Sequence, residues 1–119
     1  MKRDLMLFLE DIVTSIRDIE SFSQGVSRGR FMRDKLRQNG SIRSLEIIGE
    51  AVKNIPDSFK KRYPSVPWRD IAGFRDVLTH AYFGVDLDKV WNVLEKDLPD
   101  LKKKVLKIKK DLEKENPSK

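Results

Sequence analysis

Apolar residues recur at steps of three and four along almost the whole chain, and this period is typical of helices that bury one face. The first such run extends over about residues 4–21. Its apolar positions are Leu5, Phe8, Leu9, Ile12, Ile16 and Ile19. No stretch alternates apolar and polar residues as a half-buried strand does. The sequence therefore predicts an all-α fold.

Capping and turn residues divide this pattern into separate helices. Residues 23–27 end the first helix, and Ser27 is suited to cap a second helical region at about 29–54. We expect tertiary packing to override the weak helix propensity of Asn39 and Gly40, so that this region stays helical.

Prolines delimit the next elements. Three prolines bracket a short helical turn at about 57–62. Pro67 suits the first position of a third main helix, because a proline there gives up no helical hydrogen bond, and Gly84 closes this region.

The last predicted helix extends from 87 to about 115, with Asp86 as its N-cap and a bend or restart at Pro99. Its apolar stripe is longer than a bundle of this size needs. Residues beyond Pro99 are therefore expected either to pack on a second copy or to protrude. Helices joined by short links favour an antiparallel up-and-down bundle of about four to five helices.

The composition places the chain among small globular proteins. Its 119 residues suffice for one domain, 1–119, with a basic C-terminal helical extension at 102–119. The absence of cysteine excludes disulfides, zinc knuckles and thiol chemistry. The apolar run at 5–9 is too short for a signal peptide, and nothing approaches the ~20 apolar residues of a membrane span. We expect a cytoplasmic protein without a membrane partner.

The net charge of +6 is concentrated near the C-terminus. Residues 1–101 hold 17 basic and 16 acidic side chains, whereas residues 102–119 hold eight and three. Such an asymmetry can attract RNA, although a solvated lysine face explains it equally well. The RNA-binding candidates are Lys103 and Lys107 in this segment, and Arg30, Arg33 and Arg37 at helical spacing elsewhere.

His80 is the only histidine, and its neighbourhood carries the strongest chemical signal. Arg75 precedes it by five residues, so the two side chains would point ~140° apart in a regular helix. Asp76, four residues before His80, would share its face and could orient it. If Arg75 and His80 act together within one chain, the helix must end or distort between them.

These residue types suit RNA cleavage by transesterification. The 2′-hydroxyl needs a base, the departing 5′-oxygen needs an acid, and the phosphorane needs a cation. Histidine supplies either proton transfer, and an arginine fork matches a phosphoryl group. One histidine per chain does not easily perform both transfers, so we expect a two-fold homodimer with two histidines across one groove. A capping or core-edge role for His80 is the alternative.

Other site types find no support in the sequence. A single histidine with scattered carboxylates gives no metal-ligand spacing, and no glycine-rich phosphate loop is present, so no cofactor is expected. The aromatic residues Trp68, Phe74 and Trp91 are expected in the core.

Three motifs resemble those of HepT-like proteins, a branch of the HEPN superfamily. Arg75-x4-His80-x-Tyr82 is similar to the family's R-x4-H-x-Y signature. Residues 47–51 (IIGEA) and 67–75 (PWRDIAGFR) resemble two further segments in the same order, and 82–86 (YFGVD) continue the likeness. The resemblance covers the chain from the first helix to about Leu101.

The resemblance implies a HEPN-like bundle and a homodimer that cleaves RNA, such as mRNA or tRNA, without a metal at the dimer interface. Arg75 and His80 occupy the positions of the catalytic pair. Such proteins are toxins of toxin–antitoxin pairs, and a minimal nucleotidyltransferase antitoxin is thought to add AMP to the motif tyrosine, here Tyr82. Asp76 stands where the family often has asparagine. Its carboxylate could partly neutralise the phosphate-binding charge of Arg75, or it could support the site by orienting His80.

Two alternatives remain open from the sequence. A non-catalytic HEPN module could bind a nucleotide or a partner nucleotidyltransferase, with Arg75, His80 and Tyr82 holding phosphate and base. A plain interaction protein could use its helices only for assembly. The paired arginine and histidine favour the enzyme.

Overall fold

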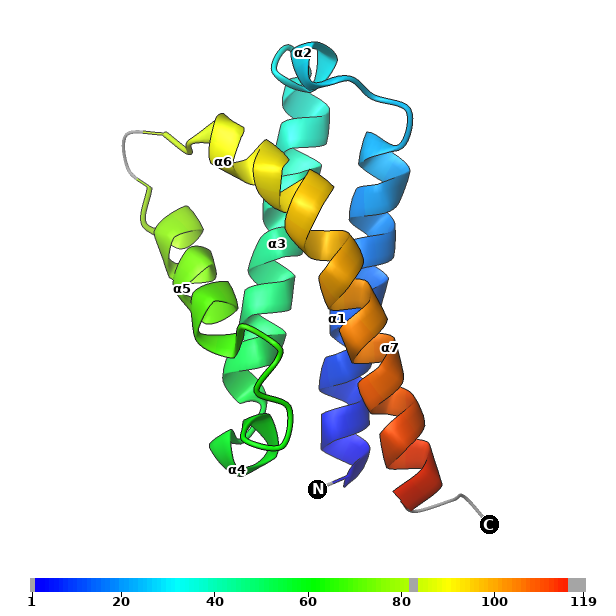
Figure 1. The fold of residues 1–119 in the computed structure, drawn as a ribbon. Coiled ribbons are helices and arrows are strands. Elements are labelled where there is room, and N and C mark those ends of the chain that lie inside the picture. Colours follow the sequence, from blue (N-terminus) through cyan, green and yellow to red (C-terminus); the bar gives the residue numbers. More distant parts are fainter. Residues whose placement is uncertain (1, 82–83, 116–119) are drawn as a thin grey trace.

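The computed structural model describes residues 2–81 and 84–115, and every regular element in these ranges is helical. The elements are α1 (Lys2–Ser23), α2 (Arg28–Phe31), α3 (Lys35–Asn54), α4 (Asp57–Lys60), α5 (Trp68–Thr79), α6 (Leu87–Asn92), the π-helical η1 (Val93–Asp97) and α7 (Leu98–Glu115). In Figure 1, α1, α3, α5 and the continuous α6–η1–α7 run alternately up and down. The predicted all-α antiparallel bundle is confirmed.

The core lies where α1 packs against α3 and α7. The apolar stripe of α1 is buried from Leu9 onward, and Leu5 and Phe8 are partly buried. The stripe of α7 is buried too, at Leu98, Leu101, Val105, Ile108 and Leu112. Ion pairs of Lys102 with Glu20 and of Lys109 with Glu10 tie the two helices together. For the described residues 100–115, the expectation that this segment protrudes or packs on a second copy was therefore wrong, because its apolar side chains pack within the chain's own core.

The second predicted helix is interrupted. Met32 to Asp34 separate α2 from α3, and the Asp34 carboxylate accepts a hydrogen bond from the Arg37 backbone N–H to start α3. The predicted cap at Ser27 is confirmed by its bond from Arg30 N–H. Helix α3 continues through Gly40 as expected. A Cβ on Gly40 would lie 3.0 Å from the Phe22 ring, so the glycine lets α1 and α3 approach closely.

The last helix changes its hydrogen-bonding pattern just before its proline. Asp86 caps α6 by accepting from Lys89 N–H, as predicted. In η1 the Leu98 N–H donates to Val93 O, five residues back, which is the bonding of a π-helix. Pro99, which has no N–H, then falls in the first turn of α7. The predicted restart at Pro99 thus takes the form of a π-helical segment.

Two glycines shape the region around α5. At Gly49 a Cβ would lie 2.6 Å from Arg75 Cγ and closer still to Arg75 Cβ, so α3 and α5 cross at this residue. Gly84 has φ +110°, a conformation that other residues rarely adopt, in the link between α5 and α6. Trp68 and Trp91 are buried as expected, whereas Phe74 is only half-buried.

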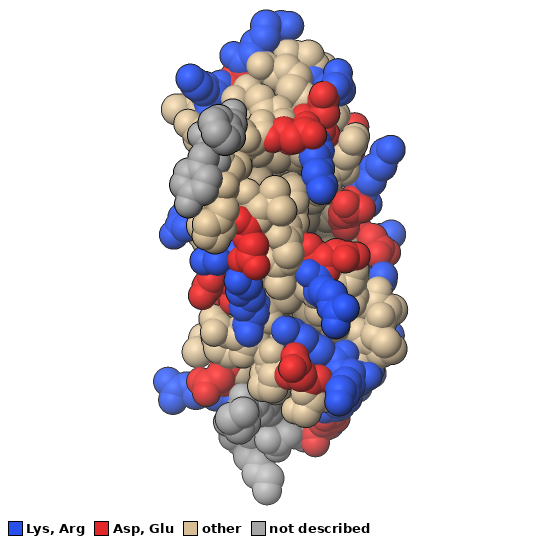
Figure 2. Space-filling model, turned by 90° about the vertical axis from the view of Figure 1, so that its left-hand side faces the viewer, with Lys and Arg blue, Asp and Glu red and all other residues tan. Residues whose placement is uncertain are grey.

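Charged side chains of both signs are interspersed on the face that carries α5 (Figure 2). This agrees with the nearly equal numbers of basic and acidic residues in 1–101. Within the described ranges, none of the helices is long and apolar enough to cross a membrane.

Candidate active site

Arg75 is held at the crossing of α3 and α5. Its side chain is 26% exposed, and its Nη2 lies 2.9 Å from a Glu50 carboxylate oxygen. Its Nη1 lies 3.3 Å from the Asp76 carboxylate. Its Nε is buried and has no hydrogen-bond partner in the described part of the chain. Gly49 makes this position available, because any larger residue there would overlap the Arg75 side chain.

Asp76 anchors Arg75 rather than lying free beside it. The carboxylate oxygen that contacts Arg75 also accepts a hydrogen bond from Lys53 Nζ at 2.5 Å. The Lys53 hydrogen bond, followed by that from Arg75, lowers the pKa of the Asp76 carboxyl below its usual value. Lys53, Asp76, Arg75 and Glu50 therefore form one alternating chain of charges across α3 and α5.

His80 terminates α5, and its ring folds back on the last turn. Its backbone N–H donates to Asp76 O at 3.0 Å, and its Nδ1 lies 2.9 Å from the same oxygen. Because a carbonyl oxygen only accepts hydrogen bonds, Nδ1 carries the proton and Nε2 is left for other partners. The side chain is exposed. Asp76 therefore orients His80 through its backbone carbonyl and not through its carboxylate.

A cleft of about 360 Å³ opens beside Arg75, between α1, α3 and α5. Its polar lining consists mainly of Asp11, Arg43, Glu46, Glu50, Arg75 and Thr79. His80 is not among the lining residues. Helix α5 ends at Thr79, between Arg75 and His80, and His80 is its C-cap with a non-helical φ of −105° and ψ of 20°. Arg75 and Thr79 therefore line the cleft, whereas His80 of the same chain does not.

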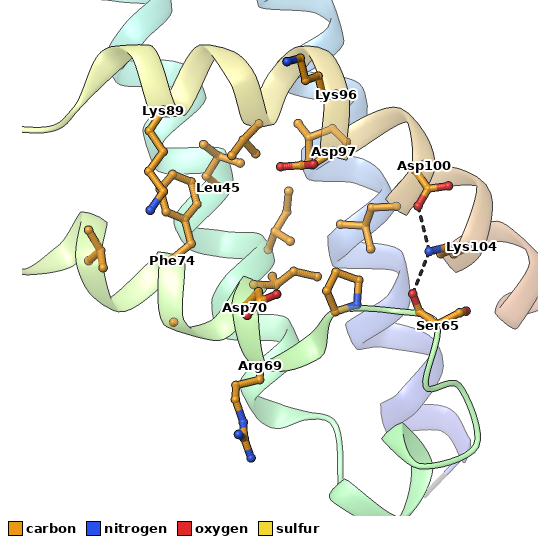
Figure 3. Close-up of a pocket in the computed structure, with 18 residues that line it drawn as sticks. Leu45, Ser65, Arg69, Asp70, Phe74, Lys89, Lys96, Asp97, Asp100 and Lys104 are labelled. Atoms are coloured by element: carbon orange, nitrogen blue, oxygen red, sulfur yellow. Dashed lines mark hydrogen bonds and ion pairs between the residues drawn. The ribbon is translucent and has the colours of Figure 1, made fainter.

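A larger cavity, about 970 Å³, lies on the other side of α5 and is bounded by η1 and the start of α7 (Figure 3). Lys104 bridges Asp100 and the Ser65 carbonyl at its rim, and Lys89 lies over the Phe74 ring. Neither Arg75 nor His80 lines it. Although this cavity is larger than the cleft beside Arg75, it is therefore not the candidate active site.

The five basic residues predicted to bind RNA lie on different elements and differ in exposure. Arg30 is in α2, Arg33 in the break and Arg37 in α3, so the three arginines do not share one helix. Arg37 is committed to the fold, because its Nε donates to Phe22 O at 2.7 Å and its Nη1 pairs with Asp34. Lys103 and Lys107 are exposed on α7, with Asp111 lying 3.6 Å from Lys107. Of the arginines, Arg30 and Arg33 remain exposed.

The sequence did not single out two charged residues of this site, namely Glu50, which pairs with Arg75, and Lys53, which pairs with Asp76. Both lie on α3, and their spacing of three residues puts them on one helical face next to Gly49. Glu50 also belongs to the IIGEA segment, whose sequence alone assigns no role to its acid. Tyr82, the predicted modification site, lies outside the described residues.

Comparisons with known proteins show the family to which the chain belongs. The family model described as "Ribonuclease HepT-like" matches residues 12–108. A "Probable ribonuclease HepT" of Thermococcus cleftensis is 48% identical over 110 residues, which are 92% of this chain and 100% of that protein. A "Putative RNase" of Caldanaerobacter subterraneus is 42% identical over 101 residues, 85% of this chain and 90% of the relative.

A "Gamma-glutamylcyclotransferase and putative RNase" of Methanocaldococcus jannaschii is 41% identical over all 119 residues, but these span only 54% of its length. No solved structure matches the chain. The family match covers α3 and α5 entirely, and with them Glu50, Arg75 and Asp76. The resemblance found in the motifs is thus confirmed, and the chain belongs to the HepT-like ribonuclease family.

Proposed function

We propose that this chain is an endoribonuclease that cleaves RNA by transesterification, without a metal ion, using Arg75 and His80. The observation that carries the proposal is the setting of Arg75. Two carboxylates and the close approach of α3 fix its guanidinium at the edge of a cleft. A guanidinium has five N–H groups, so this one keeps donors for a phosphoryl group after contacting Glu50 and Asp76.

His80 performs a proton transfer in this proposal. Its Nδ1 is bonded to the Asp76 carbonyl, so the ring has a fixed orientation and presents Nε2 to the substrate. Attack of the 2′-oxygen on phosphorus leaves a 2′,3′-cyclic phosphate and a 5′-hydroxyl end. Arg75 stabilises the charge of the phosphorane, and no metal is needed for either role.

The active form in this proposal is a two-fold homodimer. The supporting observation is that Arg75 lines the cleft, whereas His80, the C-cap of α5 in the same chain, is not among its lining residues. A second copy would supply the missing His80. Co-expression of Arg75→Ala and His80→Ala chains tests this, because a mixed dimer then keeps one complete site. About a quarter of the wild-type activity should return, and no recovery would place each site within one chain.

The biological role that we propose is that of a toxin controlled by a minimal nucleotidyltransferase. Addition of AMP to Tyr82, two residues after His80, would put a bulky anion near the RNA path and offer a phosphate to Arg75. Intact-mass measurement after co-expression with such an enzyme tests this. A chain that stays unmodified, or an addition that persists in Tyr82→Phe, would contradict control at Tyr82.

Incubation of purified protein with total RNA tests the cleavage itself. We expect 2′,3′-cyclic phosphate ends in the presence of EDTA. Both Arg75→Ala and His80→Ala should remove cleavage and growth inhibition while the circular dichroism spectrum is unchanged. The double variant should resemble either single variant, because the two residues act as a unit. Binding of RNA or nucleotide without cleavage would favour the non-catalytic module instead.

A further inference from the structure

We propose that Glu50 is the general base that takes the proton from the 2′-hydroxyl, so that one active site needs one Glu50, one Arg75 and one His80. This inference rests on the proposed ribonuclease function. It replaces the requirement for two histidines in one groove, and it assigns a chemical role to the acid of the IIGEA segment.

The position of Glu50 satisfies the geometry that such a base requires. The 2′-oxygen attacks the phosphorus whose oxygens Arg75 would bind, so the base must lie next to that arginine. A Glu50 oxygen lies 2.9 Å from Arg75 Nη2, at the edge of the cleft. The Glu50 side chain is 54% exposed, and Arg75 is its only ion-pair partner in the described ranges. Its remaining lone pairs are therefore open to a hydroxyl in the cleft.

The other ionisable groups around this carboxylate are less suited to the role. They are Asp11 on α1, Arg43, Glu46 and Lys53 on α3, and Asp76 on α5. Only Asp76 also contacts Arg75, but its carboxylate already binds Lys53 and its pKa is lowered, which makes it a weaker base. Glu46 accepts a hydrogen bond from the Thr79 hydroxyl at 3.2 Å.

The complete step conserves atoms and charge without a further reactant. Glu50 accepts the 2′-hydroxyl proton while the 2′-oxygen forms its bond to phosphorus. The bond from phosphorus to the 5′-oxygen breaks, and the protonated ring of His80 gives its Nε2 proton to that oxygen. Glu50 then returns its proton to water, and His80 regains one.

Substitution of Glu50 by glutamine tests the base directly, because the amide oxygen can still contact Arg75 but does not accept a proton. We expect Glu50→Gln to lower cleavage by about 100-fold or more while RNA affinity stays within a few-fold of wild type. The exposed Glu95→Gln is the control and should cleave normally. Unchanged cleavage by Glu50→Gln would overturn the proposal, and faster cleavage would mean that Glu50 only neutralises Arg75.

A substrate with sulfur in place of the bridging 5′-oxygen separates the base from the acid. A thiolate leaves without a proton, because thiols are much more acidic than alcohols. We expect this substrate to restore cleavage by His80→Ala and not by Glu50→Gln. If His80 supplied both the base and the acid, as in a two-histidine groove, His80→Ala would stay inactive and Glu50 would not be the base.

Mixed dimers give a second, independent result. Co-expressed Glu50→Gln and His80→Ala chains should regain activity, whereas Glu50→Gln with Arg75→Ala should not, because Glu50 and Arg75 belong to the same cleft. Recovery in the second pair would overturn the assignment. Failure of the wild-type chain to cleave any RNA would instead contradict the proposed function, and the two failures are thereby distinguishable.

Discussion

Replacement of Gly49 by alanine should force α3 and α5 apart and destabilise the protein. The added Cβ would lie 2.6 Å from Arg75 Cγ and 3.4 Å from Arg75 Cα, whereas carbon atoms pack at about 3.5–4.0 Å. The Arg75 Cβ and Cα move only with the backbone of α5. The overlap is about 1 Å at Cγ and larger at Cβ, so it must be relieved by displacing the whole helix.

Two opposing effects determine how much Gly49→Ala changes the free energy of unfolding. Alanine is favoured over glycine by about 1 kcal/mol within a helix, whereas overpacking of a tight contact costs about 1–3 kcal/mol. The contact here involves the backbone, so we take the upper value and expect a net loss of about 2 kcal/mol. Cleavage should also fall, because Arg75 loses its place beside Glu50.

Gly73→Ala is the matched control. Gly73 lies within α5, and a Cβ there would meet nothing within 4 Å. This variant should gain about 1 kcal/mol and keep its activity. Urea unfolding of the two variants measures the difference, about 3 kcal/mol. If Gly49→Ala were as stable as Gly73→Ala, the close crossing of α3 and α5 would not exist as described.

Three other perturbations test separate parts of the structure. The pKa values of Asp34 and Asp76 are lowered, chiefly by hydrogen bonds from Arg37 and Lys53. The stabilisation of the folded state by these two carboxylates is therefore present above the unfolded pKa of about 3.9 and is lost as the pH falls below it. Thermal unfolding between pH 2 and 6 should show this loss of stability, and the Asp34→Asn variant should show a smaller loss. Ile108→Ala should cost about 2–5 kcal/mol in urea unfolding because α7 belongs to the core, and a cost near zero would make α7 a dispensable extension. Arg30→Gln with Arg33→Gln should weaken RNA binding and reduce its salt slope by about 1.4, the value for two contacts to a single strand, whereas an unchanged slope would leave these arginines as a solvated surface.

The main helices could be predicted because their signals are local. Apolar spacing, Ser27, Asp86 and Pro67 mark helix bodies and starts within a few residues of sequence. The break before Asp34 was not predicted. It depends on the burial of Phe31 against Trp91, whose rings lie 5.2 Å apart, and on the bond from Arg37 to Phe22 O. Both contacts join residues far apart in the sequence, and apolar spacing and capping residues carry no information about such contacts.

The candidate site was predictable in part for the same reason. The spacing of Arg75 and His80 is visible in the sequence, and so is the possibility that a helix ends between them, as α5 does at Thr79. The role of Glu50 depends on the crossing of α3 and α5, which brings together residues 25 positions apart. The ion pair between Lys53 and Asp76 has the same origin. The spacing of residues along one helix does not predict which residues of another helix they will contact.

The antiparallel pairing of α1 with α7 affects how this domain can be joined to others. Lys102 pairs with Glu20 and Lys109 with Glu10, so the start of α1 and the end of α7 lie at one pole of the bundle, with α2 at the opposite pole (Figure 1). A neighbouring domain fused to either end would approach the same pole and leave the other uncovered. The bundle is therefore suited to modular use, and the Methanocaldococcus jannaschii relative, of which the matched stretch forms 54%, is an example of such a longer chain.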